Sequence, residues 1–241
     1  MSLKKTAKRF LWKAGFDIKT FTPTTHALAR RQHILEYYRI DTVLDVGANT
    51  GQWASELRND LGYKHRIVSF EPLPRAFEAL AKAASHDPLW EVHPFGLGNT
   101  SEELQINVAA NSQSSSMLGM LPAHIKSAPT SGYIGTEQIQ VKRLDSIFET
   151  ICQAGDSVYL KIDTQGYEEH VIDGAEGVLS RIDTIQVELS LVPLYDGELL
   201  IEDMCSKLRK KGYNLIALEE SGFSDPETGH LLQVDAIFRR A

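Results

Sequence analysis

A glycine-containing turn that also carries an acid is the part of this sequence best suited to hold a ligand. Asp45-Val46-Gly47-Ala48-Asn49-Thr50-Gly51 follows a short apolar run at 42–44 and leads into a helical pattern that begins at Gln52. Glycine adopts positive φ at little cost and lets the backbone approach a ligand closely. A second acid, Glu71, ends the next apolar run at 67–70. Two acids at the ends of neighbouring parallel strands, with the turn between them, predict a nucleoside site at the carboxyl edge of a doubly wound sheet.

The spacing of the glycines distinguishes between nucleoside cofactors. Gly47 and Gly51 do not match the G-x-G-x-x-G fingerprint of dinucleotide sites, and the sequence has no Gly-Lys-Ser/Thr of a P-loop. An acid such as Asp45 is unfavourable beside a pyrophosphate, whereas S-adenosylmethionine carries a sulfonium and an ammonium and no phosphate. We therefore predict S-adenosylmethionine, with Asp45 near its amino-acid end and Glu71 on its ribose hydroxyls. The alternative is an ordinary turn in which Asp45 only caps the next helix.

A lysine and two acids at the ends of later apolar runs are the candidates for catalysis. Strand alternation sends Lys161 and Asp163 to one face, and a lysine inside an apolar strand is costly to bury unless it is paired. Glu188 lies in the next predicted strand. A hydroxyl that attacks a methyl group benefits from a general base or a metal. Asp163 is therefore the first candidate for a base or for the ligand of a divalent metal, with Lys161 and Glu188 assisting. The alternative is an ion network that only holds strand ends together.

The histidines do not predict a zinc site. The sequence contains neither His-x-His nor His-Glu-x-x-His spacing. His170 could assist Asp163, but we expect it to be an exposed histidine on a helix.

The elements that must position these residues alternate between strands and helices, which predicts a parallel sheet. The last two strands, at 214–218 and 234–239, are joined by a polar turn and are predicted to be antiparallel. The fold class is therefore α/β and Rossmann-like, with a mostly parallel, seven-stranded, doubly wound sheet that contains one antiparallel strand. Residues 109–135, rich in Ser, Ala, Gly and Pro, are predicted to form a mobile flap beside the site. The other expected strands are 42–46, 66–70, 90–95, 104–108, 137–141, 157–162 and 183–189, and the expected helices include 24–38 and 199–211.

The composition is that of a globular protein with one sizeable α/β domain in 241 residues. The sequence has no apolar run near the ~20 residues needed to cross a bilayer, and we expect no signal peptide. Cys152 and Cys205 lie far apart, which indicates free thiols and a cytoplasmic protein.

Charge divides the chain into a basic extension at 1–40 and an acidic domain at 41–241. The extension holds nine Lys/Arg and two Asp/Glu, whereas the remainder of the chain holds sixteen Lys/Arg and thirty Asp/Glu. An acidic domain argues against binding to nucleic acid. The extension is predicted to form a helix that either lies on an anionic membrane surface or packs its apolar side chains on the domain. The residues concerned are Lys4, Lys5, Lys8, Arg9 and Lys13 with Phe10, Leu11 and Trp12.

Three motifs in order, at 45–52, 70–72 and 161–168, resemble those of the FkbM family of S-adenosylmethionine-dependent methyltransferases, over about residues 40–240. The resemblance implies a class I methyltransferase fold and O-methylation of sugars or polyketide-like natural products. Many relatives carry Glu where this chain has Gln165, which argues against a metal role common to the family at that position. The resemblance also places residues 96–99 at the adenine and ribose edge, although a simple Gly-Leu-Gly-Asn turn is the alternative. The implied cofactor-binding residues are Asp45, Gly47, Asn49, Gly51, Gln52, Glu71, Pro72 and Asn99.

The expected function is O-methylation of a hydroxyl on a sugar, a glycoconjugate or a related natural product. Tyr133, Trp90 and Tyr195 are available to stack on a sugar ring. The partner is thus a small-molecule or glycan acceptor, and the sequence is compatible with a homo-oligomer. One alternative is a nicotinamide-dependent sugar epimerase or reductase, whose Tyr-x-x-x-Lys is absent here. The other alternative is a non-catalytic module that binds the cofactor.

Overall fold

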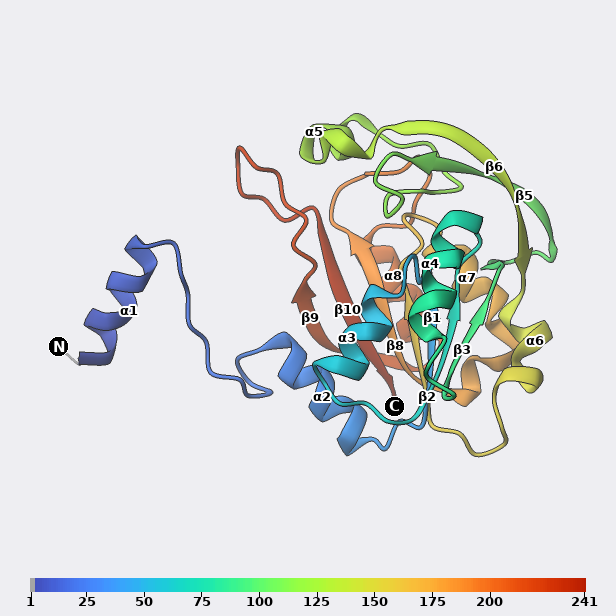
Figure 1. The fold of residues 1–241 in the computed structure, drawn as a ribbon, viewed down its shortest axis with the longest axis horizontal. Helices are drawn as coiled ribbons and strands as arrows, with labels where there is room; N and C mark the ends of the chain where they lie inside the picture. Colours follow the sequence, from blue (N-terminus) through green and yellow to red (C-terminus); the bar gives the residue numbers. More distant parts are fainter. Residues whose placement is uncertain (1–2) are drawn as a thin grey trace. The chain divides into compact units, whose positions relative to one another are not determined.

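The chain divides into two compact units, one ending at Arg39 and the other spanning Ile40–Ala241. The structure is a computed structural model that describes residues 3–241. The side chains of residues 3, 4, 6 and 7 are not described, and the first two residues of the expected extension lie outside this range. The first unit contains two helices, α1 (Leu3–Lys13) and α2 (Ala27–Tyr37), drawn in blue in Figure 1. The helix expected over 24–38 therefore begins three residues later and ends one residue earlier.

The second unit is built on a seven-stranded sheet with the order β3-β2-β1-β7-β8-β10-β9. Each strand pairs in parallel with its neighbour from β3 to β8, and β10 is antiparallel to both β8 and β9. The predicted sheet with one antiparallel strand is thus confirmed. The chain order reverses between β1 and β7, which is the point where open α/β sheets bind ligands. The strands are β1 (Thr42–Val46), β2 (Arg66–Phe70), β3 (Trp90–His93), β7 (Val158–Ile162), β8 (Ile182–Ser190), β9 (Tyr213–Glu220) and β10 (Gln233–Arg240).

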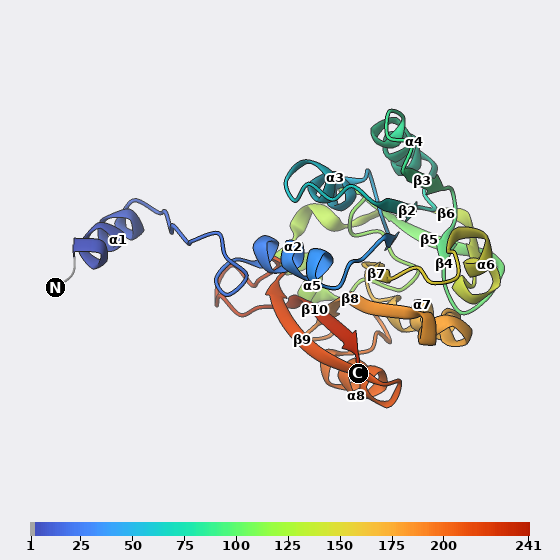
Figure 2. The same cartoon turned by 90° about the horizontal axis from the view of Figure 1, so that it is seen from below.

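Helices cover both faces of this sheet. Figure 2 shows α3 (Gln52–Asn59) and α4 (Pro74–Ala84) on one face and α6 (Leu144–Ile151), α7 (Glu168–Gly174) and α8 (Ile201–Lys210) on the other. The largest hydrophobic core lies under the second group, where apolar side chains of β1, β2, β7 and β8 meet those of the helices. The alternate side chains of β1 and β7, which point to the opposite face, include the charged residues of the site.

The apolar face of α4 differs from the sequence prediction. The sequence spacing predicts an apolar face made of Phe77, Leu80, Ala81 and Ala84. In the structure the buried residues are Ala76, Leu80 and Ala84, and Phe77 and Ala81 are only half-buried. Pro74 stands at the first turn of the helix. Ala76, Leu80 and Ala84 stand at i, i+4 and i+8, so they lie along one face of the helix, and Leu80 at its centre is fully buried.

A smaller sheet lies above the carboxyl ends of the parallel strands (Figure 1). It has the order β4-β6-β5, formed by β4 (Gly96–Leu97), β5 (Glu102–Ala109) and β6 (Tyr133–Lys142). The strands predicted at 104–108 and 137–141 are therefore confirmed, but they pair with each other outside the main sheet. The predicted flap at 109–135 also contains α5 (Pro122–Ser127) and the 3₁₀ helix η1 (Pro129–Ser131).

Gly47 in the turn after β1 cannot be replaced without strain. Its φ is +76°, and an added Cβ would lie 1.8 Å from the carbonyl oxygen of Asp163. We expect Gly47→Ala to lower the free energy of unfolding by about 1–3 kcal/mol or more, since the strained φ and the clash act together. Gly135→Ala, in open space on β6 and without a positive φ, should change it by less than about 0.5 kcal/mol. Chemical denaturation of both variants tests this, and equal stabilities would contradict it.

Candidate active site

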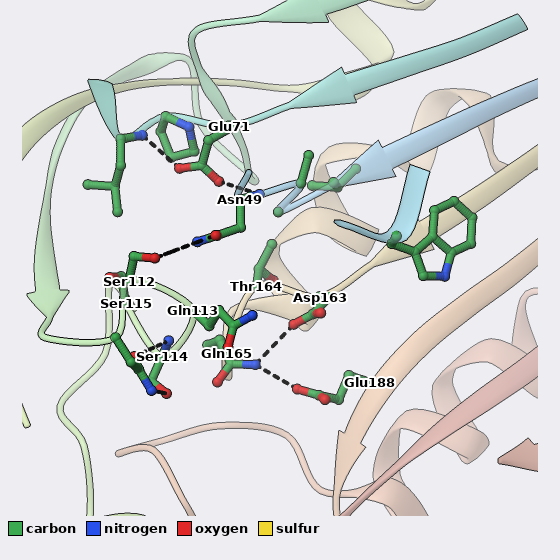
Figure 3. Close-up of a pocket in the computed structure, with 18 of the residues that line it drawn as sticks. Asn49, Glu71, Ser112, Gln113, Ser114, Ser115, Asp163, Thr164, Gln165 and Glu188 are labelled. Atoms are coloured by element: carbon green, nitrogen blue, oxygen red, sulfur yellow. Dashed lines mark hydrogen bonds between the residues drawn. The ribbon is translucent and has the colours of Figure 1, made fainter. Parts of the chain in front are cut away.

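A cavity of about 420 Å³ opens at the carboxyl ends of β1, β2, β7 and β8. Its walls come from the turn after β1, the start of the segment after β2, the loop after β7 and the Ser-rich segment at 111–115 (Figure 3). The predicted site residues that line it are Gly47, Asn49, Gln52, Glu71, Pro72, Lys161, Asp163 and Glu188. Three predicted cofactor residues, Asp45, Gly51 and Asn99, do not line it, and each has another role.

The turn after β1 is held by backbone hydrogen bonds. The N–H groups of Gly47 and Ala48 both donate to the carbonyl of Phe70, at 3.1 and 3.0 Å. Gly51, with φ +85°, forms the N-cap of α3, and an added Cβ there would come within about 3.1 Å of Leu80 and Trp90. Gly51 is therefore required for packing rather than for ligand contact. Because the cap of α3 is this glycine, the alternative in which Asp45 caps the helix is wrong.

Glu71 presents a fixed carboxylate to the cavity. Its Oε2 accepts the N–H of Asn49 at 2.9 Å, and its Oε1 accepts the N–H of Leu73 at 2.8 Å, as Figure 3 shows. Each oxygen keeps a lone pair for a ligand hydroxyl. Burial raises the pKa of Glu71 to about 7, although the two N–H groups lower it. The Asn49 side chain donates to Ser112 at 3.2 Å, which joins the turn to the Ser-rich segment.

Lys161 is the charged centre of the site. Its Nζ lies 3.2 Å from Asp45 Oδ1 and 3.4 Å from Asp163 Oδ2. Burial lowers the pKa of Lys161, but the carboxylates of Asp45 and Asp163 outweigh this effect and hold it above its ordinary value. The pairing predicted between Lys161 and Asp163 is confirmed. Asp45 is fully buried and faces Lys161 and Ser69, so its carboxylate does not reach the cavity as expected.

Gln165 connects the two acids that were predicted to act together. Its Nε2 donates to Asp163 Oδ1 at 3.0 Å and to Glu188 Oε2 at 2.7 Å, shown by dashed lines in Figure 3. Gln233 also donates to Glu188 Oε2, at 3.0 Å. Burial, followed by the charge of Asp163, raises the pKa of Glu188 well above its usual range, which favours the protonated form. The predicted Lys161–Asp163–Glu188 network therefore exists, but an amide stands between the two acids.

The loop after β7 owes its shape to a buried acid. Glu168 Oε1 accepts the N–H groups of Thr164 at 2.8 Å and of Gly166 at 3.2 Å. Gln165, between them, adopts a φ of +54°. Burial raises the pKa of Glu168 to about 7. The strained φ directs the Gln165 side chain toward the two acids, and strain of this kind concentrates at functional sites.

Tyr195, which was expected only to stack on a sugar ring, and His124, which sequence analysis did not place in the site, support Gln165 from behind. Tyr195 Oη donates to Gln165 Oε1 at 2.7 Å and lies 3.0 Å from His124 Nε2, while His124 Nδ1 lies 3.0 Å from Ser131 Oγ. Burial lowers the pKa of His124, which lines the cavity. His124 has no spacing that marks it, since only the fold brings α5 beside the segment of Tyr195.

The aromatic residues expected to stack on a sugar have other roles. Tyr195 is fully buried, and Trp90 is buried with its indole N–H donating to Ser69 Oγ. Tyr133 donates to the carbonyl of Leu118. The aromatic side chains on the cavity wall are instead Trp53 and Phe223.

Asn99 and His170 also differ from expectation. Asn99 accepts a hydrogen bond from Arg143 through its carbonyl, and Gly96 and Leu97 line the cavity in its place. His170 is half-buried and stacks on Tyr167 at 4.0 Å between ring centroids, outside the cavity. Within residues 3–241 no three His, Cys, Asp or Glu side chains are grouped closely enough to hold a metal ion.

The sheet order, the switch point and the site at the strand ends define a class I methyltransferase fold. Residues 45–215 match the model of the methyltransferase FkbM domain. Since the match covers well over half of the chain, the protein belongs to the FkbM methyltransferase family. Among curated protein sequences none matches this chain.

Several solved structures are similar to this chain at low sequence identity. The methyltransferase FkbM of Methylobacillus flagellatus is 14% identical, with a TM-score of 0.51 over 82% of this chain and 43% of that protein. The present chain thus spans less than half of the length of the Methylobacillus flagellatus protein. A TehB-like S-adenosylmethionine-dependent methyltransferase of Corynebacterium glutamicum is 13% identical, with a TM-score of 0.42 over 99% and 97% of the two chains. LepI in complex with S-adenosylmethionine is 13% identical, with a TM-score of 0.46 over 100% and 53%.

S-adenosylmethionine is the cofactor of this family, and the charges of the cavity suit it. Glu71, Asp163 and Glu188 are acids on the cavity wall, and Lys161, a basic side chain there, is already paired with two carboxylates. Such a wall accommodates a cationic ligand better than a phosphate.

Removal of the Lys161 charge should destabilise the protein strongly. Lys161→Met leaves Asp45 fully buried without its partner, and breaking a buried pair costs about 3–5 kcal/mol. The double variant Asp45→Asn/Lys161→Met removes both charges and should recover much of that loss. Urea unfolding of the wild type, Asp45→Asn, Lys161→Met and the double variant measures the coupling. Additive losses in the double variant would contradict the account of this pair.

Proposed function

We propose that this protein transfers the methyl group of S-adenosylmethionine to a hydroxyl of a small, uncharged acceptor, such as a sugar, a glycoconjugate or a related natural product. The observation that carries the proposal is the position of Asp163. Its side chain is 35% exposed at the carboxyl end of β7, on the cavity wall, and two donors orient it. A carboxylate placed in this way can accept the proton of a hydroxyl nucleophile.

The turn after β1 and Glu71 are proposed to hold the cofactor. Glu71 would accept the ribose hydroxyls, since each oxygen already bonded to a backbone N–H has a second lone pair. Gly47, Asn49, Gln52 and Pro72 line the same part of the cavity. Asp45 would act indirectly, by holding Lys161. The cofactor supplies an electrophilic methyl group when it is bound.

Asp163, Lys161 and Gln165 divide the remaining work between them. In our proposal Asp163 is the general base for the acceptor hydroxyl. Lys161 and Gln165 act as positioning residues, because each donates to a different oxygen of the Asp163 carboxylate. Glu188, in its protonated form, would orient the acceptor rather than take its proton.

The segment at 111–115 supports an uncharged and hydroxylated acceptor. Asn111, Ser112, Gln113, Ser114 and Ser115 line the cavity with amides and hydroxyls. Such groups bind sugar hydroxyls without a charge on the ligand. The acidic domain argues against a nucleic-acid substrate. Family membership disfavours the nicotinamide-dependent alternative, and a non-catalytic module would bind the cofactor and release no S-adenosylhomocysteine with any acceptor.

Asp163→Asn tests the general base. We expect turnover to fall by about 10²–10⁴-fold, with affinity for S-adenosylhomocysteine near that of wild type. Turnover is followed as S-adenosylhomocysteine release with an acceptor found in a panel of sugars and glycoconjugates. Glu188→Gln is the matched control in the same site and should lose much less activity. Full activity of Asp163→Asn would remove this residue from the mechanism.

Cofactor affinity should depend on pH through Glu71. Because burial raises the pKa of Glu71 to about 7, its carboxylate becomes protonated as the pH falls through 7 and can no longer accept two hydroxyls. Affinity for S-adenosylhomocysteine should therefore weaken below pH 7, approaching about tenfold per pH unit. Calorimetry over a pH series measures this effect. Glu71→Gln should bind weakly and without that dependence, and an unchanged pH profile in this variant would refute the ribose assignment.

A further inference from the structure

We propose that the first unit binds the surface of an anionic phospholipid membrane through α1 and the segment that follows it. This inference is independent of the proposed function. It rests on two features of residues 5–21, namely a concentration of exposed apolar side chains and a concentration of positive charge.

Exposed apolar side chains gather in this short segment. Phe10 and Trp12 on α1 are 74% and 53% exposed, and Phe16, Ile18 and Phe21 after it are 66%, 66% and 56% exposed. Fourteen large apolar side chains are exposed among the described residues, and five of them fall within these twelve positions. Single exposed apolar residues are ordinary, but a run of them marks an interaction surface.

Positive charge surrounds these side chains. Residues 1–40 carry nine Lys/Arg, and Asp17 is the only acid before Glu36. Asp17 pairs with Lys8 at 3.3 Å and accepts the indole N–H of Trp12 at 2.9 Å. Lys8 also lies 5.2 Å from the Trp12 ring centroid. Lys5, Arg9, Lys13 and Lys19 add charge around this contact.

Aromatic rings interleaved with lysines fit a membrane interface. A short helix of this kind lies in the headgroup plane, with its apolar face at the acyl boundary and its basic groups on anionic lipids. Phe10 faces the acyl boundary in this arrangement, and Trp12, two positions on and therefore on another face, lies at the headgroup level where indole rings are common. Across residues 3–241, every helix is too short or too polar to cross a bilayer, and α1 has eleven residues. The occupant we infer is therefore a lipid surface on which α1 lies.

Flotation of the full chain with vesicles tests the proposal. We expect binding to vesicles of phosphatidylcholine mixed with phosphatidylglycerol, weak binding to phosphatidylcholine alone, and release at high salt. Trp12 emission should shift to the blue on binding, and Trp12→Phe should remove that shift. Equal binding to both vesicle types, binding to neither, or stronger binding to duplex DNA than to the anionic vesicles would overturn the proposal.

Variants assign the binding to the segment. The triple change Lys5→Glu/Lys8→Glu/Arg9→Glu should lower vesicle partitioning by at least about tenfold, since each basic group contributes to attraction. The double change Phe10→Ser/Phe16→Ser should also lower vesicle partitioning by at least about tenfold at low salt, because it removes two apolar side chains from the binding segment. The matched controls are Lys64→Glu/Lys82→Glu/Lys210→Glu and Ile134→Ser, which alter exposed residues of the second unit. All variants should keep their affinity for S-adenosylhomocysteine, and equal losses in the controls would contradict the assignment.

Discussion

The site depends on one buried cation between two carboxylates. Lys161 is 5% exposed, and such a charge is tolerated only where partners compensate its lost hydration. The register of β1 and β7 places Asp45 directly beside Lys161, and Asp163 follows two residues later. The ion pair therefore ties the central strands together at the switch point. It also orients the acid that reaches the cavity.

This arrangement separates stability from chemistry on the two faces of the sheet. Leu44 and Leu160 point into the large core under α6, α7 and α8, while Asp45 and Lys161 point to the opposite face. Gln165 then extends the polar network to Glu188, and Tyr195 and His124 support it. A carboxylate held by this many neighbours keeps one orientation, which is what proton transfer to a fixed atom requires.

Sequence patterns predicted those parts of the structure that depend on local order. The positions of β1 and β2 follow from the short apolar runs at 42–44 and 67–70, and the pairing of Lys161 with Asp163 follows from strand alternation. The burial of Asp45, the outward position of Asn99 and the roles of Tyr195 and His124 depend on distances between segments far apart in the chain, which no local pattern contains.

The central claim is that the acidic, glycine-lined cavity binds S-adenosylmethionine and not a phosphate-bearing cofactor. The most direct test is calorimetric titration of the purified protein with S-adenosylmethionine, S-adenosylhomocysteine and NADH. The account predicts binding of the first two in the micromolar range and no heat with NADH. Binding of NADH alone, or of none of the three, would contradict it.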